Sequence, residues 1–214
     1  HRRLNARRRS RTTGGGGDEQ KHGPAHANDL ANPWVLVHTA PVRGQLHERL
    51  LAWYRDNRRD LPWRRKRDPY AIWVSEIMLQ QTRVATVIPY FERFMAKYPT
   101  VRDLAAADND EVRSMWSGLG YYRRAQSMLK AADKIVADHD GALPSDPEAL
   151  RDLPGLGPYT TGAVASIAFG HPQPAVDGNV IRVMSRLLRL EEDPTKAKTR
   201  RTIETEVKAL QVLG

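Results

Sequence analysis

The chain has 214 residues, of which 40% are hydrophobic and 28% charged, and this is enough to bury a core and to form one or two domains. The absence of cysteine excludes disulfides and thiolate-held metals within these residues, and the absence of long apolar runs predicts a soluble chain with no membrane partner. The net charge of +9 favours polyanionic partners such as nucleic acids.

The first 41 residues are predicted to form a disordered basic tail. An arginine-rich stretch, RRLNARRRSR, is followed by GGGG and by recurring Pro, His, Asn and Asp residues, a composition that buries too little apolar surface to fold. More than half of the excess positive charge lies in residues 1–44. Such a segment could be a nucleic-acid arm, a nuclear address or a transit peptide, but a solvated extension without a role is the favoured interpretation.

From Val42 onward the hydrophobic residues follow helical spacing. Leu46, Leu50 and Trp53 recur every three or four residues in a first helix that ends near Asn57. After the proline-containing loop RRDLPWRRKRDPY, further helices are predicted at 70–85, 87–97, 101–106, 109–115, 121–138, 147–153, 158–169, 179–189 and about 196–212. No segment alternates as a strand does, so the predicted fold class is all-α, with short connecting loops.

The stretch WVSEIMLQQTRV places one carboxylate in a helix that is otherwise almost wholly apolar. At helical spacing Glu76 has Ile72 and Trp73 one turn before it, and Leu79 and Gln80 one turn after it. A carboxylate on such a face loses hydration, which raises its pKa and lets it keep a proton near neutral pH for transfer to a substrate. Taken alone, a carboxylate that is turned to solvent or paired with an arginine is the commoner case.

The sequence LPGLGPYTTG, which begins at Leu153, predicts a tight turn followed by a helix. Its glycines, Gly155 and Gly157, let the backbone approach a partner closely, and Pro158 suits the first turn of a helix. The free N–H groups at such a helix start bind phosphate without reading the base sequence. The alternative is an ordinary glycine turn, but together with its flanking helices the segment resembles the helix-hairpin-helix motif.

Asp177, in AVDGNVIRV, stands directly before a predicted helix. In this position a carboxylate caps free N–H groups and is stabilised by the helix dipole, so it stays ionised. The surroundings expected for Glu76 therefore favour its protonated form, and those expected for Asp177 favour its ionised form. Such a pair can supply an acid and an anion to one reaction. The plainer alternative is an N-cap with no further role.

Together these stretches closely resemble the MutY adenine DNA glycosylases of the helix-hairpin-helix superfamily. WVSEIMLQQTRVATVIPYF, GLGYY, LPGLGPYTTGA and VDGNVIRV occur in that family's order and spacing, and RDLPW at 59–63 adds a further match. The resemblance covers about 42–213 and implies the helix-hairpin-helix DNA glycosylase fold. It implies a six-helix barrel domain with the hairpin at 71–183, and a second, incomplete iron–sulfur-type helical domain at 42–70 and 184–214.

The resemblance also implies roles for individual residues. Glu76 falls at the position of the general acid that protonates adenine, and Asp177 at that of the carboxylate that stabilises the developing sugar cation. Tyr159 and Asn179 match residues that support these two carboxylates. The remaining assignments are Arg59, Leu61 and Trp63 for the pocket of the extruded adenine; Gln81, Thr82, Leu119 and Tyr121 for the wedge in the duplex and the contact with the opposing base; and Pro154, Gly155, Leu156, Gly157 and Thr160 for the phosphate-binding hairpin.

One position separates two related reactions. Relatives that also cut the backbone, such as endonuclease III, carry a hairpin lysine that forms a Schiff base with the sugar. Here the aligned residue is Tyr159, and no lysine occurs between Lys134 and Lys196. We therefore expect a monofunctional glycosylase that removes adenine mispaired with 8-oxoguanine or guanine and leaves an abasic site. An endonuclease III-like glycosylase/lyase and a non-catalytic helix-hairpin-helix DNA-binding module remain as alternatives.

The resemblance also implies a cofactor and partners. MutY proteins hold a 4Fe-4S cluster with four cysteines and carry a C-terminal domain that recognises 8-oxoguanine. This chain ends at Gly214 before either, and truncation is the favoured explanation because QVLG stops within a predicted helix. The expected partner is double-stranded DNA with an A:8-oxoguanine or A:G mispair, bound by a monomer. The expected location is the nucleoid of a bacterium, or the nucleus or mitochondrion of a eukaryote.

Overall fold

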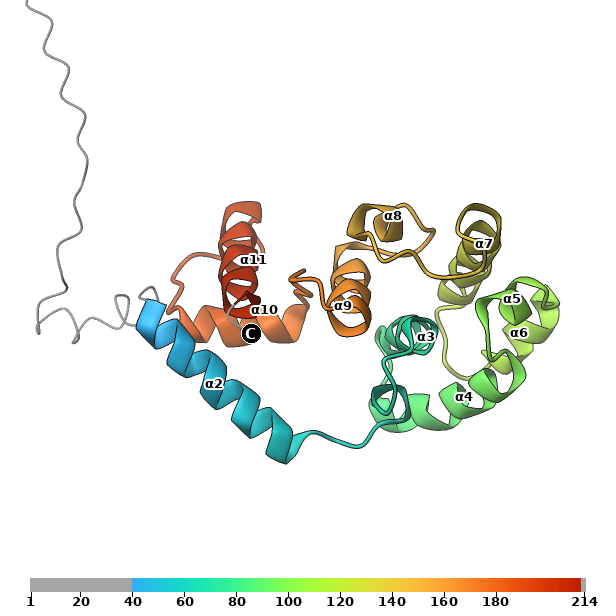
Figure 1. The fold of residues 1–214 in the computed structure, drawn as a ribbon, viewed down its shortest axis with the longest axis horizontal. Helices are drawn as coiled ribbons and strands as arrows, with labels where there is room; N and C mark the ends of the chain where they lie inside the picture. Colours follow the sequence, from blue (N-terminus) through green and yellow to red (C-terminus); the bar gives the residue numbers. More distant parts are fainter. Residues whose placement is uncertain (1–39, 213–214) are drawn as a thin grey trace, which may run out of the picture.

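The computed structural model describes residues 40–212, and every regular element in this range is helical (Figure 1). The α-helices are α2 (Ala40–Asn57), α3 (Pro69–Leu79), α4 (Val84–Lys97), α5 (Val101–Ala105), α6 (Asn109–Met115), α7 (Arg123–Asp138), α8 (Pro147–Arg151), α9 (Pro158–Phe169), α10 (Gly178–Leu187) and α11 (Ala197–Gln211), and a short 3₁₀-helix, η2 (Pro62–Arg64), precedes α3. The all-α prediction is thus confirmed for the described part of the chain. The predicted tail, 1–41, lies outside the described residues except for its last two, which begin α2.

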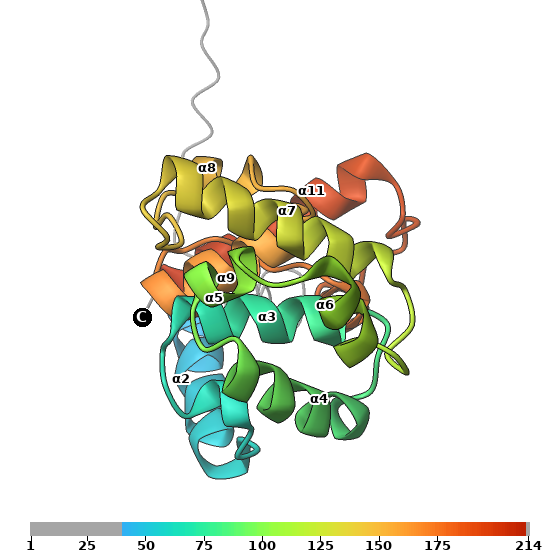
Figure 2. The same ribbon diagram turned by 90° about the vertical axis from the view of Figure 1, so that its right-hand side faces the viewer.

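Helix α3 forms the centre of the larger hydrophobic cluster. It begins with Pro69 and is capped by Asp68, whose side chain accepts a hydrogen bond from the backbone N–H of Tyr70 at 3.0 Å. The helix lies between α4 and α7 and packs along α9 (Figures 1 and 2). Because neighbours cover it on most sides, nearly all of its side chains are apolar, and Glu76 is its only charged residue. The largest fully buried side chains around it are Trp73, Met78, Phe94 and Trp116.

The predicted helix at 70–85 is wrong at its C-terminal end, because residues 80–83 form a turn between α3 and α4. The Nη1 group of Arg124 donates hydrogen bonds, at 2.6–3.0 Å, to three carbonyl oxygens near this end: those of Ile77, Met78 and Gln80. These are the carbonyls that would accept from later N–H groups if the helix continued. A side chain from α7 therefore terminates α3, and the local sequence gives no sign of it.

A second, smaller hydrophobic cluster is formed by α10 and α11, on the left of Figure 1, around Met184, Leu188 and Ile203. Helix α2 packs on α11, and an Arg43–Glu206 ion pair at 2.8 Å joins the two helices. The chain therefore passes between the two clusters twice, once after α2 and once after α9. The structure groups α10 with the second cluster, while the predicted domain boundaries stay a prediction. No helix within 40–212 combines the length and apolar character of a membrane span.

Helices α8 and α9 form the predicted hairpin, and Leu153 and Leu156 anchor its turn in the core. Gly155 has a φ of +81°, and a Cβ there would lie 2.7 Å from the Cβ of Ser127. The turn is thus pressed against α7 at a point where only glycine fits. The prediction that Pro158 starts the following helix is confirmed, with Gly157 in the N-cap position.

A second close approach fixes the segment that leads to α10. A Cβ on Gly162, in the middle of α9, would lie 2.4 Å from the carbonyl oxygen of Pro174 and 2.9 Å from its carbon. The obstacle is backbone, so it cannot rotate away as a side chain would. The missing side chain of Gly162 therefore lets the chain pass α9 closely just before Asp177, and it sets the position of that residue relative to α9.

We expect Gly162→Ala to lower the free energy of unfolding by about 1–3 kcal/mol, because the added methyl group overpacks a site that cannot relax freely. Urea unfolding followed by circular dichroism measures this change. Gly44→Ala, within α2, is the matched control, because a Cβ there meets nothing within 4 Å. That substitution should stabilise the protein by about 0.5–1 kcal/mol through helix propensity. A Gly162→Ala protein as stable as the parent would contradict the close approach.

Candidate active site

Glu76, Asp177 and the hairpin meet in one cavity of about 670 Å³. The cavity lies where α3, the start of α9, the start of α10 and α11 come together. Its lining residues are Glu76, Leu79, Gln80, Gln81, Gly155, Gly157, Pro158, Tyr159, Thr160, Asp177, Gly178 and Arg200. The structure therefore brings together the glycine turn and two carboxylates that lie about a hundred residues apart in the sequence.

The surroundings of Glu76 favour its protonated form. Burial raises the pKa of this carboxyl group above its ordinary value of 4.5, and the negative charge of Asp177 acts in the same direction. A hydrogen bond with Tyr159 and the positive charge of Arg64 partly oppose this rise in pKa. Burial, with Glu76 nearby, also raises the pKa of the Tyr159 hydroxyl, so this group stays protonated and can donate to the carboxylate. Glu76 thus has the properties of a proton donor.

The carboxylate of Asp177 is held in place by hydrogen-bond donors. Its Oδ1 accepts from the backbone N–H of Val180 at 2.8 Å, so it is the N-cap of α10. Its Oδ2 accepts from Nδ2 of Asn179 at 2.9 Å, and Oδ1 of Asn179 accepts from Nη2 of Arg182 at 2.9 Å. Both carboxylate oxygens are therefore oriented, and Asn179 acts on Asp177 without lining the cavity itself.

The hairpin presents backbone to the cavity. Gly155, Gly157 and Pro158 are exposed at its edge, and no side chain caps the N–H groups at the start of α9. These donors are available to an anion such as a phosphate. Of the other predicted hairpin residues, Leu156 has its side chain buried in the core, whereas Thr160 lines the cavity and its hydroxyl accepts a hydrogen bond from Gln80 at 3.3 Å. Pro154 is half-buried and does not line the cavity.

Two of the predicted wedge residues share a second, adjoining cavity of about 430 Å³. Gln81 and Tyr121 both line it and both have left-handed backbones, with φ values of 56° and 47°. For residues other than glycine this conformation costs roughly 1–3 kcal/mol, and it commonly occurs at binding sites. Tyr121 is 60% exposed, whereas the side chain of Leu119 is buried and cannot enter a duplex as the structure stands. Thr82 is half-buried beside Arg124.

Arg124 connects the two loops that carry Gln81 and Tyr121. Besides its bonds to the end of α3, its Nη2 group donates to the carbonyl oxygens of Leu119 and Gly120 at 3.2 and 3.1 Å. Its guanidinium also lies over the rings of Trp116 and Tyr121, at 5.4 and 5.5 Å from their centroids. One planar cation therefore sets the relative position of both loops.

The three residues predicted to line the adenine pocket do not line the cavity. Leu61 and Trp63 are buried in the core, where Trp63 packs edge-on against Phe91 with ring centroids 5.3 Å apart. Arg59 is exposed on the surface. The next residue, Arg64, does affect the cavity, because its positive charge lowers the pKa of Glu76. The assignment of the adenine pocket stays a prediction.

Arg124 and Arg200 also contribute to the site, although no sequence motif predicts either of them. Arg200 lies in the first turns of α11 and lines the cavity beside the Asp177 segment. Neither residue stands in a motif that suggests its contacts, because each reaches backbone 24 or more positions away.

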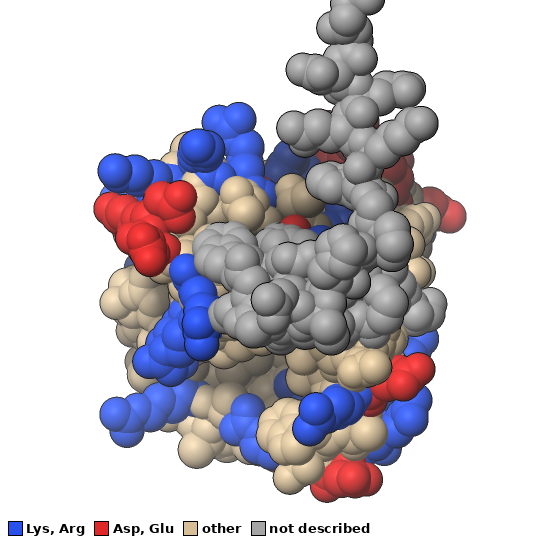
Figure 3. Space-filling model, turned by 90° about the vertical axis from the view of Figure 1, so that its left-hand side faces the viewer, with Lys and Arg blue, Asp and Glu red and all other residues tan. Residues whose placement is uncertain are grey.

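Figure 3 views the side formed by α2, α10 and α11, on which Lys and Arg side chains are widely spread.

No group of three or more His, Cys, Asp or Glu side chains within 40–212 could hold a metal ion. Iron–sulfur clusters are held by cysteine thiolates, and the chain has no cysteine. The residues present therefore do not fit a 4Fe-4S cluster.

Comparison with known proteins gives consistent matches. A profile of the HhH-GPD superfamily of base excision DNA repair proteins matches residues 74–209. The chain is 50% identical over 157 residues to the adenine DNA glycosylase of Rattus norvegicus, an alignment that covers 69% of this chain and 30% of that protein. The chain thus spans about a third of the length of this relative or less.

Solved structures with the same fold include a thermostable thymine-DNA glycosylase, with a TM-score of 0.69 and 29% identity over 78% of this chain and 77% of that one. A non-covalent complex of endonuclease III with DNA gives a TM-score of 0.62 and 25% identity, over 80% of this chain and 85% of that one. Both likenesses extend over most of the described residues.

We expect Arg124→Lys to lower the free energy of unfolding by about 2 kcal/mol, because an ammonium group cannot reproduce the planar set of hydrogen bonds. The amides of 80–82 and 119–121 should also exchange with deuterium faster, since both loops lose their common anchor. Hydrogen exchange followed by mass spectrometry measures this effect. The exposed neighbour Arg123, changed to Lys, is the control. Equal exchange in the two variants would argue against the anchoring role.

We expect Glu76→Gln to raise the melting temperature at neutral and alkaline pH. Because the pKa of Glu76 is raised in the folded state, its favourable contribution is present below pH 4.5 and lost as the pH rises through the folded-state pKa. Gln does not ionise, so the stability gap between variant and parent should widen over that pH range. Thermal unfolding at a series of pH values measures it, with Glu48→Gln on the exposed face of α2 as control. A gap that does not change with pH would exclude a buried, uncharged Glu76.

Proposed function

Because the chain belongs to the HhH-GPD superfamily of base excision DNA repair proteins, and within it to the MutY family, we propose that it is a monofunctional adenine DNA glycosylase. In this proposal it hydrolyses the N-glycosidic bond of adenine mispaired with 8-oxoguanine or guanine, and leaves an abasic site. The observation that carries the proposal is the cavity that Glu76 and Asp177 share next to a glycine hairpin. Glu76 is largely buried there, whereas Asp177 accepts hydrogen bonds at a helix start.

The reaction needs an acid because adenine leaves poorly as an anion. Glu76 donates its proton to the adenine ring as the C1′–N9 bond breaks, and the bonding electrons leave with the base. The sugar becomes an oxocarbenium-like cation, which the fixed negative charge of Asp177 stabilises. Water then adds its oxygen to C1′, and the proton that it releases returns to Glu76. The products are free adenine and an abasic site, with both carboxyl groups in their starting states.

The target base must leave the duplex to reach this cavity. A base inside the stack is inaccessible, so glycosylases extrude the nucleotide and fill the gap with side chains. In our proposal Gln81 and Tyr121, at the adjoining cavity, occupy that gap, one by hydrogen bonding and the other by stacking. The N–H groups of the hairpin and of the start of α9 bind the backbone of the same strand.

The proposal excludes a lyase step. A glycosylase that also cuts the strand needs an amine to attack C1′, and no lysine is among the described residues that line the cavity. Tyr159 occupies the hairpin position instead, and its hydroxyl stays protonated because its pKa is raised. Double-stranded DNA is the proposed partner, and the nucleoid, nucleus or mitochondrion is the proposed location. A 4Fe-4S cluster takes part in no step of this proposal.

The test uses duplexes with adenine opposite 8-oxoguanine or guanine. We expect strand breaks at the adenine only after treatment with alkali, because a monofunctional enzyme leaves an intact backbone at the abasic site. Breaks without alkali would indicate the glycosylase/lyase alternative, and binding without breaks would leave a DNA-binding module. A duplex with an A:T pair at the same position serves as the specificity control.

In the same assay Glu76→Gln should reduce the single-turnover rate of excision by about 10²- to 10⁴-fold while DNA binding is kept. The parent rate should fall as the pH rises through the raised pKa of Glu76, since only the protonated acid can donate. Glu48→Gln should have the parent rate and pH profile. Excision by Glu76→Gln at the parent rate would remove Glu76 from its role.

A further inference from the structure

Arg200 is the one cationic side chain among the described residues that line the active-site cavity. The lining also contains the carboxylate of Asp177, which is an unfavourable neighbour for a polyanionic DNA strand. The proposed chemistry gives Arg200 no task. Its position therefore requires a separate explanation.

The guanidinium of Arg200 is held beside the segment that carries Asp177. Its Nη2 donates to the carbonyl oxygen of Val176 at 3.4 Å, and its Nε donates to the carboxylate of Glu204 at 3.3 Å. A guanidinium has five N–H donors, so these two bonds leave donors for a ligand. The pair with Glu204 is solvent-exposed, with 45% and 38% of the side-chain surfaces accessible, and such a pair is easily outcompeted.

These donors and the hairpin belong to different parts of the cavity wall. The hairpin residues Gly155 and Gly157 come from the larger hydrophobic cluster, whereas Arg200 comes from α11 in the smaller one. A nucleotide whose sugar lies between Glu76 and Asp177 has a phosphate on each side. One phosphate can meet the hairpin N–H groups, and the other then needs a donor on the remaining wall. Arginine is the side chain best suited to phosphate, because its planar N–H groups match two oxygens at once.

We propose that Arg200 binds a backbone phosphate next to the extruded adenosine, as a second phosphate contact besides the hairpin. This inference rests on the proposed function, because it requires a DNA strand in the cavity. Arg200 is a binding residue in this proposal: it holds the strand, and it offsets the repulsion between that strand and the carboxylate of Asp177.

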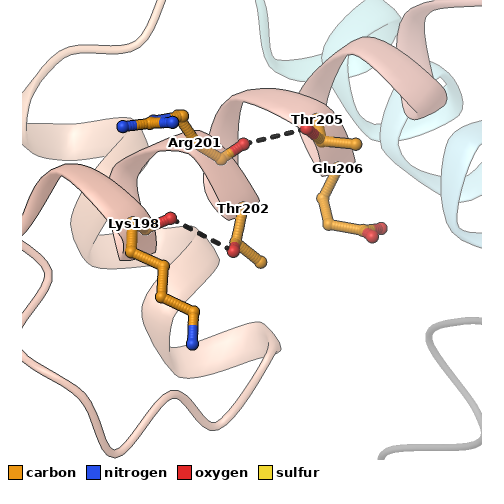
Figure 4. A pocket seen from close by; sticks show the side chains of 5 residues that line it. All are labelled: Lys198, Arg201, Thr202, Thr205 and Glu206. Atoms are coloured by element: carbon orange, nitrogen blue, oxygen red, sulfur yellow. Dashed lines mark hydrogen bonds between the residues drawn. The ribbon is translucent and has the colours of Figure 1, made fainter.

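The test compares Arg200→Gln with Arg201→Gln. Both substitutions remove one positive charge from α11. Arg201, however, lines a separate surface pocket together with Lys198, Thr202 and Thr205 (Figure 4). Binding is measured to a duplex with a non-cleavable 2′-fluoroadenosine opposite 8-oxoguanine, over a series of salt concentrations. We expect Arg200→Gln to weaken binding about tenfold and to lower the salt slope by about one. Arg201→Gln should stay within about twofold of the parent.

Methylphosphonate substitution identifies the phosphate. A neutral methylphosphonate on the 5′ or the 3′ side of the target removes the charge that Arg200 would meet. At one of these two positions the parent protein should lose affinity, and Arg200→Gln should lose nothing further. Arg200→Lys should keep most of the salt slope, which separates loss of charge from a defect in folding.

Two results would overturn the inference alone: equal binding by the Arg200→Gln and Arg201→Gln proteins, or a loss for Arg200→Gln that persists with both methylphosphonates. In either case the parent would still excise adenine, so the proposed function would stand. A parent protein that neither binds nor cleaves any of these duplexes would overturn both proposals together.

Discussion

Burial of one ionisable side chain in a central apolar helix is the constraint on which the site depends. Helix α3 is covered by α4, α7 and α9, so Glu76 can hydrate only through the cavity that it lines. Its raised pKa is a direct consequence of that burial. A carboxyl group at the same place on an exposed helix would keep an ordinary pKa and would hold its proton less well. The same burial therefore packs the core and raises the pKa of Glu76. Burying an ionisable group in this way costs stability, a common trade-off at active sites.

Asp177 has different surroundings, because the segment before it crosses α9 and places it at the start of α10. The segment that leads to it crosses α9 at Gly162 so closely that no side chain fits, and it then ends at the first turn of α10. There the carboxylate accepts hydrogen bonds from the backbone N–H of Val180 and from Asn179, which orient both of its oxygens. The two carboxyl groups of the cavity thus have different surroundings: Glu76 lies on a buried helix face, and Asp177 lies at a helix start. The family match to residues 74–209 is consistent with this arrangement, since it spans both.

Sequence patterns predicted the all-α class, most helix positions, the hairpin and both carboxylates, because each depends on local spacing or on a turn residue. What they missed depends on contacts between distant segments. Helix α3 ends at Leu79 because Arg124 binds its carbonyl oxygens, and that residue is more than forty positions away. The burial of Leu119, and Arg200 in the cavity wall, likewise follow from how helices pack. Spacing along one helix contains no information of this kind.

The pairing of α2 with α11 has a mechanical consequence. Since α2 is joined to the smaller cluster, two peptide connections link that cluster to the larger one, and they run after α2 and after α9. A single tether would let the two bodies swivel in any direction. Two tethers restrict the relative motion of these two groups of helices more than one tether would. Glu76 lies on α3 in the larger cluster and Asp177 caps α10 in the smaller one, so the second connection also limits how far the gap between acid and anion can change.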